Sequence, residues 1–253
     1  MTVFLRKRPA NCLAGFGLWL FDRNFDGVAD EQIRLGQADD VPVTGDWNGD
    51  GICDIGVCRT DGNLRTWELR LRGVRHDGEA WNTFQSEDAN SEPVTADING
   101  DGIANIGDVV RLKEGRLFRW MFQTASDVPT VRHTPGLSGT PIVGDWNGDQ
   151  RDDRGIVLSG TPENQQQLRW KLYVDAEPQP DEAFADFRFG VTTDVPIVGD
   201  WNADGKCDPA VFRTINGNPA EWLFDTDGRG GIPERECRFG KRGDIPVILS
   251  IGG

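Results

Sequence analysis

The sequence lacks any stretch of about 10–15 residues in which apolar side chains recur at helical spacing, which argues against a helical fold. It also lacks an apolar run approaching the ~18 residues of a membrane span. Residues 1–6 lack the apolar core of a signal peptide. We therefore expect no membrane span, and we expect any export signal to have been removed or replaced.

Cysteine and positive charge are both scarce. The five cysteines are an odd number and form no Cys-x-x-Cys pair or Cys/His cluster, so no disulfide framework is predicted. Cys58 and Cys237 align with Phe212 and Ile33 in the repeat described below, which predicts buried, hydrophobic roles for both. With 27 Lys and Arg against 41 Asp and Glu, the net charge of −14 gives no electrostatic basis for binding nucleic acid.

A repeat of about 50 residues runs through the whole chain. Its first marker is a proline followed by valine or isoleucine, at Pro42, Pro93, Pro141, Pro196 and Pro246. Its second marker is a tryptophan in a short apolar segment, at Trp19, Trp67, Trp120, Trp170 and Trp222. The markers alternate and leave no remainder, so residues 1–253 are predicted to be a single repeat domain.

Each unit has the pattern of four short antiparallel strands, which is the blade of a β-propeller. Thr2–Arg6 resembles the second strand of a unit, whereas Pro246–Ser250 resembles a first strand. The predicted fold is therefore all-β, a five-bladed β-propeller of four-stranded antiparallel blades. We expect the C-terminal strand to pair with the N-terminal three strands, which would close the ring and remove two exposed sheet edges.

Four of the proline-led strands run into an acidic loop with the spacing of a calcium site. Counted from the first Asp, side-chain oxygens stand at positions 1, 3, 5 and 9, and position 7 would offer its backbone carbonyl, as calcium loops require. The predicted ligands, in the order 1, 3, 5, 7 and 9, are Asp46, Asn48, Asp50, Ile52 and Asp54; Asp97, Asn99, Asp101, Ile103 and Asn105; Asp145, Asn147, Asp149, Arg151 and Asp153; and Asp200, Asn202, Asp204, Lys206 and Asp208.

Position 6 is glycine in three loops and Gln150 in the fourth, where a positive φ would cost roughly 1–2 kcal/mol. An EF-hand would need flanking helices and an acid at position 12, and only Asp108 supplies one. Residues 97–108 taken alone are therefore also compatible with a dockerin loop. The remaining alternative is that all four loops are ordinary Asp- and Asn-rich turns.

These loops make the chain resemble the FG-GAP/VCBS repeat family, which includes the propeller of integrin α subunits and related bacterial surface proteins. The resemblance covers essentially the whole chain through its Asp-x-Asn-x-Asp-Gly-x-x-Asp loops. It implies calcium at the turn between the first two strands of a blade. Members of the family more often have six or seven blades, so the five counted here are a departure.

Four calcium ions are thus expected, with a candidate fifth in the loop after the first tryptophan strand. That loop has the same spacing, at Asp22, Asn24, Asp26 and Asp30. Its counterparts, at Asp225–Gly228 and Arg72–Gly78, do not repeat the spacing, so an ordinary acidic turn is the alternative.

The sequence offers no Gly-x-Ser-x-Gly, His-Glu-x-x-His or phosphate-cradling loop, and the protein is predicted not to be an enzyme. The expected function is a non-catalytic, calcium-stabilised binding module for a carbohydrate or protein ligand, extracellular or at a cell surface. We expect a monomer or a domain of a larger surface protein. Alternatives are a glycan-active hydrolase or lyase using channel carboxylates, and a purely structural spacer. Recognition is expected in the irregular loops opposite the acidic loops, such as Ser159–Gln167 and Lys241–Asp244.

Overall fold

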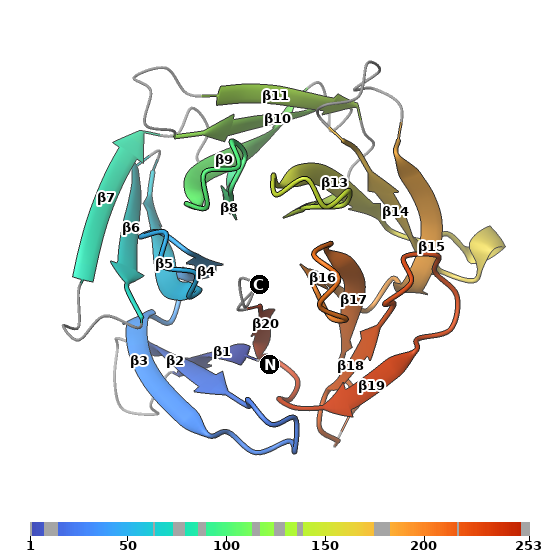
Figure 1. Ribbon diagram of the computed structural model, residues 1–253. Helices are drawn as coiled ribbons and strands as arrows, with labels where there is room; N and C mark the ends of the chain where they lie inside the picture. The colour runs from blue at the N-terminus through green and yellow to red at the C-terminus, as the bar shows by residue number, and fades with distance from the viewer. Residues whose placement is uncertain are drawn as a thin grey trace.

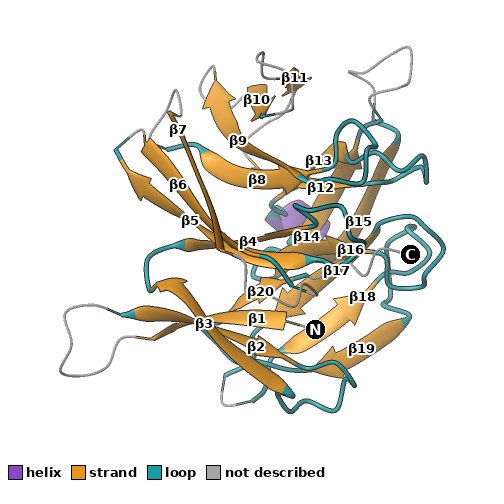
Figure 2. Ribbon diagram, turned by 60° about the vertical axis from the view of Figure 1, so that its left-hand side comes forward, coloured by secondary structure: helices purple, strands orange, loops and turns teal. Residues whose placement is uncertain are grey.

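The computed structural model describes residues 2–7, 15–62, 64–72, 79–85, 90–112, 117–123, 130–135, 139–174, 183–216 and 218–248. In these ranges every regular element is a β-strand, apart from the single 3₁₀ turn η1 (Pro162–Asn164). Figure 2 shows this dominance of strands. None of the described segments forms a helix long and apolar enough to cross a membrane.

The strands are short and follow one another with little else between them. They are β1 (Thr2–Lys7), β2 (Phe16–Phe21), β3 (Glu31–Gln37), β4 (Val41–Gly45), β5 (Asp54–Asp61), β6 (Leu64–Arg70), β7 (Glu79–Gln85), β8 (Glu92–Ala96), β9 (Asn105–Leu112), β10 (Leu117–Phe122), β11 (Thr130–Pro135), β12 (Gly139–Gly144), β13 (Asp153–Leu158), β14 (Gln167–Leu172), β15 (Ala185–Val191), β16 (Val195–Gly199), β17 (Asp208–Arg213), β18 (Glu221–Phe224), β19 (Arg235–Arg238) and β20 (Ile245–Val247).

Within the described residues these strands form five four-stranded antiparallel sheets. Their strand orders are β20-β1-β2-β3, β4-β5-β6-β7, β8-β9-β10-β11, β12-β13-β14-β15 and β16-β17-β18-β19. The sheets stand around a centre in a propeller-like ring, with β3, β7, β11, β15 and β19 at the periphery (Figure 1). The strands β20, β4, β8, β12 and β16 contact one another in a closed cycle. The prediction of an all-β, propeller-like ring of antiparallel sheets is confirmed.

The two ends of the chain meet in one sheet. Strand β1 pairs antiparallel with β20, with Thr2 opposite Val247, Val3 opposite Pro246 and Phe4 opposite Ile245. The two strands lie side by side in the ring (Figure 1). The predicted pairing of the C-terminal strand with the N-terminal strands is confirmed for these positions, and residues 249 and 250 lie outside the described part.

The apolar core lies between neighbouring sheets. The five repeat tryptophans are all fully buried, each on the third strand of its sheet counted outward from the centre. Trp19 clusters with Ile55 and Val57 of the next sheet, and Trp170 clusters with Val211 in the same way. The predicted role of these tryptophans in packing between blades is confirmed. Replacing one with alanine would cost about 3–5 kcal/mol.

The contact between the sheets of β6 and β9 contains a charged pair at a position that is apolar in the equivalent strands. Asp108 on β9 stands where the equivalent strands place Val57, Ile156 and Val211, and it is fully buried. Its Oδ1 accepts a hydrogen bond at 3.4 Å from Nε of Arg65, a buried residue on β6. Asp108 therefore belongs to an ion pair between sheets. Because its loop is flanked by strands, the dockerin and EF-hand alternatives for residues 97–108 are wrong.

We expect the strand pair β1–β20 to be needed for a cooperative fold. A truncation after Asp244 removes β20, exposes the edge of β1 and removes Val247 from the cluster around Trp19. It should aggregate or lose its single thermal transition, as followed by size-exclusion chromatography and circular dichroism. A truncation after Ile248 keeps β20 and is the matched control. Equal monomer content and equal melting of the two truncations would contradict the closure.

Candidate metal-binding loops

The four predicted calcium loops occupy equivalent places in four of the five sheets. They join β4 to β5, β8 to β9, β12 to β13 and β16 to β17, and they surround the centre of the ring on one side (Figure 1). We call this side the acidic face. The fifth sheet has no such loop in the described residues, because its first strand, β20, and its second, β1, come from opposite ends of the chain.

The aspartate at position 1 closes each loop by binding the backbone of position 6. The Oδ2 atom of Asp46 accepts the N–H of Gly51 at 2.7 Å, and Asp97 accepts that of Gly102 at 2.8 Å. The corresponding distances are 2.7 Å from Gln150 to Asp145 and 3.0 Å from Gly205 to Asp200. The carboxylate at position 1 thus fixes the same turn in each of the four loops.

Positions 3, 5 and 7 continue this pattern. In the first loop the Nδ2 of Asn48 donates to Oδ2 of Asp50 at 3.1 Å, and the N–H of Ile52 donates to Oδ1 of Asp50 at 2.9 Å. The same two bonds recur in the other three loops, at Asn99 and Ile103, Asn147 and Arg151, and Asn202 and Lys206. The side chains at position 7 are exposed, as expected for a position that would contribute only its carbonyl.

Position 9 is the first residue of the second strand and is buried in every loop, at Asp54, Asn105, Asp153 and Asp208. Asp54 accepts backbone N–H groups from Trp47 at 3.2 Å and Arg72 at 2.5 Å. Burial raises the pKa of Asp54, and these two hydrogen bonds oppose the rise. Burial also raises the pKa of Asp208 to about 7, with the neighbouring acids Asp204 and Asp200 adding to the rise.

The donor set of these loops suits calcium in kind, because it consists of carboxylate and amide oxygens. A carboxylate oxygen that accepts one N–H keeps a second lone pair for a cation. In addition, Oδ2 of Asp208 is buried and has no hydrogen-bond partner among the described residues. The residues therefore fit a calcium ion by their chemistry. The carboxylates of positions 1, 5 and 9 are not among the described groups of three that gather within 4.8 Å.

Consecutive acidic loops are hydrogen-bonded to one another, which the sequence pattern did not indicate. Ala104 donates its N–H to the carbonyl of Asp46, Asp152 to that of Asp97, and Cys207 to that of Asp145, each at 2.7 Å. These donors all stand at position 8, which carries no ligand in the predicted pattern. The only sequence signal is that position 8 falls one residue before the strand in every unit.

Asp152 is an acid that the repeat does not explain, because position 8 is Cys53, Ala104 and Cys207 in the other loops. Its Oδ2 accepts the N–H of Asp97 at 2.8 Å, so the side chain bridges two loops. Burial raises the pKa of Asp152 to about 7, and the charges of Asp97 and Asp145 contribute to the rise.

The candidate fifth loop joins β2 to β3, also on the acidic face. Oδ2 of Asp22 accepts the N–H of Gly27 at 2.9 Å, and Oδ2 of Asp30 accepts that of Arg23 at 2.7 Å. Asn24 donates to Asp26 at 3.0 Å, so all four predicted residues hydrogen-bond within one turn.

The β18–β19 loop does not repeat the spacing of the β2–β3 loop in sequence, but two of its hydrogen bonds have the same arrangement. Oδ2 of Asp225 accepts the N–H of Gly230 at 2.8 Å, and Oε2 of Glu234 accepts that of Thr226 at 2.9 Å. These bonds are the counterparts of those made by Asp22 and Asp30. The last acid comes one residue later than in the β2–β3 loop, so the similarity is hidden when positions are compared one by one.

The other side of the ring, the opposite face, carries the irregular loops. Ser159–Gln167 contains η1, with Gln165 and Gln166 at φ values of 60° and 58°. A hollow of about 440 Å³ on the same face is lined by Ile215, Asn216, Asn218, Pro219, Gly240, Lys241 and Arg242. The loop Lys7–Phe16 lies mainly outside the described residues, as does His76.

The cysteines behave as hydrophobic side chains. Among the described residues no disulfide is formed by Cys53, Cys58, Cys207 or Cys237; the predicted burial is confirmed for Cys58, whereas Cys237 is only half-buried. Burial raises the pKa of Cys58 to about 12 and that of Cys237 to about 11, so neither is a reactive thiolate at neutral pH. Cys12 lies outside the described part.

The geometry defines the class of protein as an all-β, propeller-like ring with repeated acidic loops on one face. Comparisons with protein-family models, curated proteins and solved structures found no match for this chain.

We expect the substitution Gln150→Gly to stabilise the protein. Gln150 has φ 68°, where glycines at the same position have φ 79°, 82° and 83°. Relief of about 1–2 kcal/mol of strain, less the greater chain entropy of unfolded glycine of about 0.5–1 kcal/mol, leaves a gain of roughly 0.5–1 kcal/mol. Denaturant unfolding in excess chelator would measure it.

The reciprocal substitution Gly205→Gln is the matched control. A Cβ at Gly205 meets no atom within 4 Å, so only its φ of +83° opposes a side chain. This variant should lose about what Gln150→Gly gains. If both variants unfold like the unsubstituted protein, the turn is not strained at position 6.

Proposed function

We propose that this chain is a non-catalytic, calcium-stabilised β-propeller module that recognises a carbohydrate or protein ligand at a cell surface or outside the cell. The observation that carries the calcium part is the fourfold repetition of one turn. In each loop the position-1 carboxylate binds position 6, and a buried oxygen-bearing side chain stands at position 9. Ordinary turns need only one such bond, so the retention of oxygens at positions 3, 5 and 9 favours a cation.

We also propose that the five sheets are the blades of a closed five-bladed propeller. The support is the cycle of contacts among β20, β4, β8, β12 and β16, together with the pairing of β20 and β1. This arrangement is compatible with FG-GAP/VCBS-like repeats, in which the metal would sit at the turn between the first two strands of a blade.

Ligand recognition is assigned to the opposite face. The loops of the acidic face hold their carboxylates in hydrogen bonds within the turns, which leaves them suited to a metal rather than to a variable ligand. The opposite face instead carries exposed amide side chains at Gln165 and Gln166, and a hollow beside Asn216 and Arg242. Irregular loops on a rigid scaffold are common sites of recognition.

Calcium should raise the melting temperature. At affinities of about 10⁻⁴–10⁻³ M, ~1 mM calcium stabilises by roughly 0.4–1.4 kcal/mol per site and by about 2–6 kcal/mol for four. Scanning calorimetry in calcium and in excess chelator would measure this shift. The double variant Asp46→Asn/Asp50→Asn should show a smaller shift, whereas the control Asp61→Asn, an exposed residue beyond the loops, should match the unsubstituted protein. Identical melting temperatures with and without calcium would show that the loops are ordinary turns that bind no calcium.

A ligand found by glycan or protein array screening should depend on the opposite face. The variant Gln165→Ala/Gln166→Ala and the variant Asn216→Ala/Arg242→Ala should each weaken its binding in calorimetric titrations. The control Asn24→Ala/Arg229→Ala removes exposed polar side chains from the acidic face and should leave binding unchanged. Loss of affinity only in the control would place recognition on the acidic face.

A further inference from the structure

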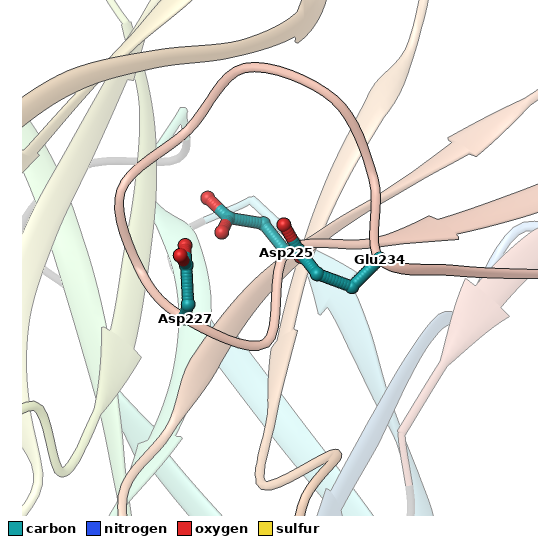
Figure 3. Close-up of side chains that lie close together, drawn as sticks. All are labelled: Asp225, Asp227 and Glu234. Carbon is teal, nitrogen blue, oxygen red and sulfur yellow. The ribbon is translucent and has the colours of Figure 1, made fainter.

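The β18–β19 loop gathers three carboxylates that belong to none of the four repeated acidic loops. One ligand atom each from Asp225, Asp227 and Glu234 lie within 4.8 Å of one another, the only such group of acids, cysteines or histidines in the described residues. Figure 3 shows the three side chains facing a common point inside the curve of the loop. Asp227 and Glu234 are exposed, so the group is open to solvent on one side.

Asp225 is the buried member of this group, with an exposed fraction of 0%. Its Oδ2 is held by the N–H of Gly230, but its Oδ1 is buried and has no hydrogen-bond partner among the described residues. A buried carboxylate oxygen without a partner loses its hydration without compensation, which is costly. The free energy would be recovered if a cation stood at the point that this oxygen shares with Asp227 and Glu234.

The positively charged side chains nearby do not supply that cation. Arg229 approaches Asp227 only to 3.9 Å, and 84% of its side chain is exposed, so solvent screens it. The guanidinium of Arg235 lies 4.6 Å above the ring of Phe25 and 5.8 Å above that of Phe224. The neighbouring carboxyl group of Asp208 supplies no positive charge either.

The backbone holds the three carboxylates in place. The N–H of Thr226 donates to Oε2 of Glu234 at 2.9 Å, and the N–H of Arg229 donates to Oδ1 of Asp227 at 3.0 Å. Each bond fixes one oxygen and leaves the other oxygen of the same carboxylate able to coordinate. The loop is also hydrogen-bonded to the neighbouring sheet, because the N–H of Gly231 donates to the carbonyl of Arg188 on β15 at 3.1 Å.

We propose that the β18–β19 loop binds a divalent cation through Asp225, Asp227 and Glu234. Three hard oxygen ligands without nitrogen or sulfur select calcium or magnesium rather than zinc. The open side leaves room for water to complete the coordination. Calcium is the better match, since it accepts several carboxylates in irregular geometry, whereas magnesium favours one or two carboxylates with several waters.

This site is separate from the four loops of the proposed function. The β18–β19 loop joins the third and fourth strands of its sheet, whereas the four repeated loops each join the first and second strands of theirs. The two classes touch at one place, where Nδ2 of Asn202 donates to the carbonyl of Thr226 at 2.9 Å. Calcium bound in the β18–β19 loop would therefore also stabilise the neighbouring 200–208 loop.

The test is calorimetric titration of the full chain, freed of metal by chelation, with calcium and separately with magnesium. The variant Asp227→Asn/Glu234→Gln should bind one calcium fewer per chain than the unsubstituted protein and should melt no lower than it in chelator, because two like charges are removed. The control Asp61→Asn/Glu236→Gln removes two exposed carboxylates elsewhere and should retain the full number. If the double variant does not fold, the single exposed substitution Glu234→Gln replaces it.

The outcomes separate this site from the proposed function. An unchanged number of calcium ions and unchanged affinities in the variant would overturn the β18–β19 site while leaving the four repeated loops intact. A number of bound calcium ions that is unchanged by Asp46→Asn/Asp50→Asn but falls by one in the β18–β19 variant would support the site and count against the 46–54 loop. No calcium or magnesium binding by the unsubstituted chain would overturn both, and a proton shared by Asp225 and Asp227 would then account for the close carboxylates.

Discussion

Burial of one tryptophan between each pair of neighbouring sheets is the interaction on which the structure depends. A four-stranded sheet of this size cannot cover its own apolar face, so Trp19, Trp67, Trp120, Trp170 and Trp222 must pack against the next sheet. Every sheet therefore needs a neighbour on both sides. That requirement is met only when the last sheet reaches the first, which makes the pairing of β20 with β1 a condition of the core.

The same packing explains why the acidic loops repeat so closely. Each sheet packs against the preceding sheet. The residue at position 8 of one acidic loop therefore lies close to the residue that precedes position 1 in the acidic loop of the preceding sheet. A Cβ added to Gly45 would lie 2.7 Å from that of Ala104, and one added to Gly144 would lie 2.8 Å from that of Cys207. The glycines at these two positions leave room for the position-8 side chains. The backbone hydrogen bonds between loops follow from the close approach.

The sequence was most informative where the repeat acts on single positions. The alternation of proline and tryptophan predicted the strands, the buried tryptophans and the meeting of the two termini. It predicted little of what depends on contacts between units. Arg65 and Asp108 are 43 residues apart and replace an apolar contact by an ion pair, which no periodicity signals. The group at Asp225, Asp227 and Glu234 was missed because one additional residue in the loop shifts its last acid out of register, while the folded loop still brings that acid back.

In the described residues, β20 and β1 pair as neighbours in one sheet although they are far apart in sequence. Strands β20 and β1 are already neighbours, so covalent continuity between them adds nothing to the strand order. Joining these ends and opening the chain in a connection on the opposite face, such as that between β15 and β16, would give a circularly permuted ring with the same strand neighbours. The strand order of the ring is thus set by strand pairing and by contacts between sheets, not by a covalent link between β20 and β1.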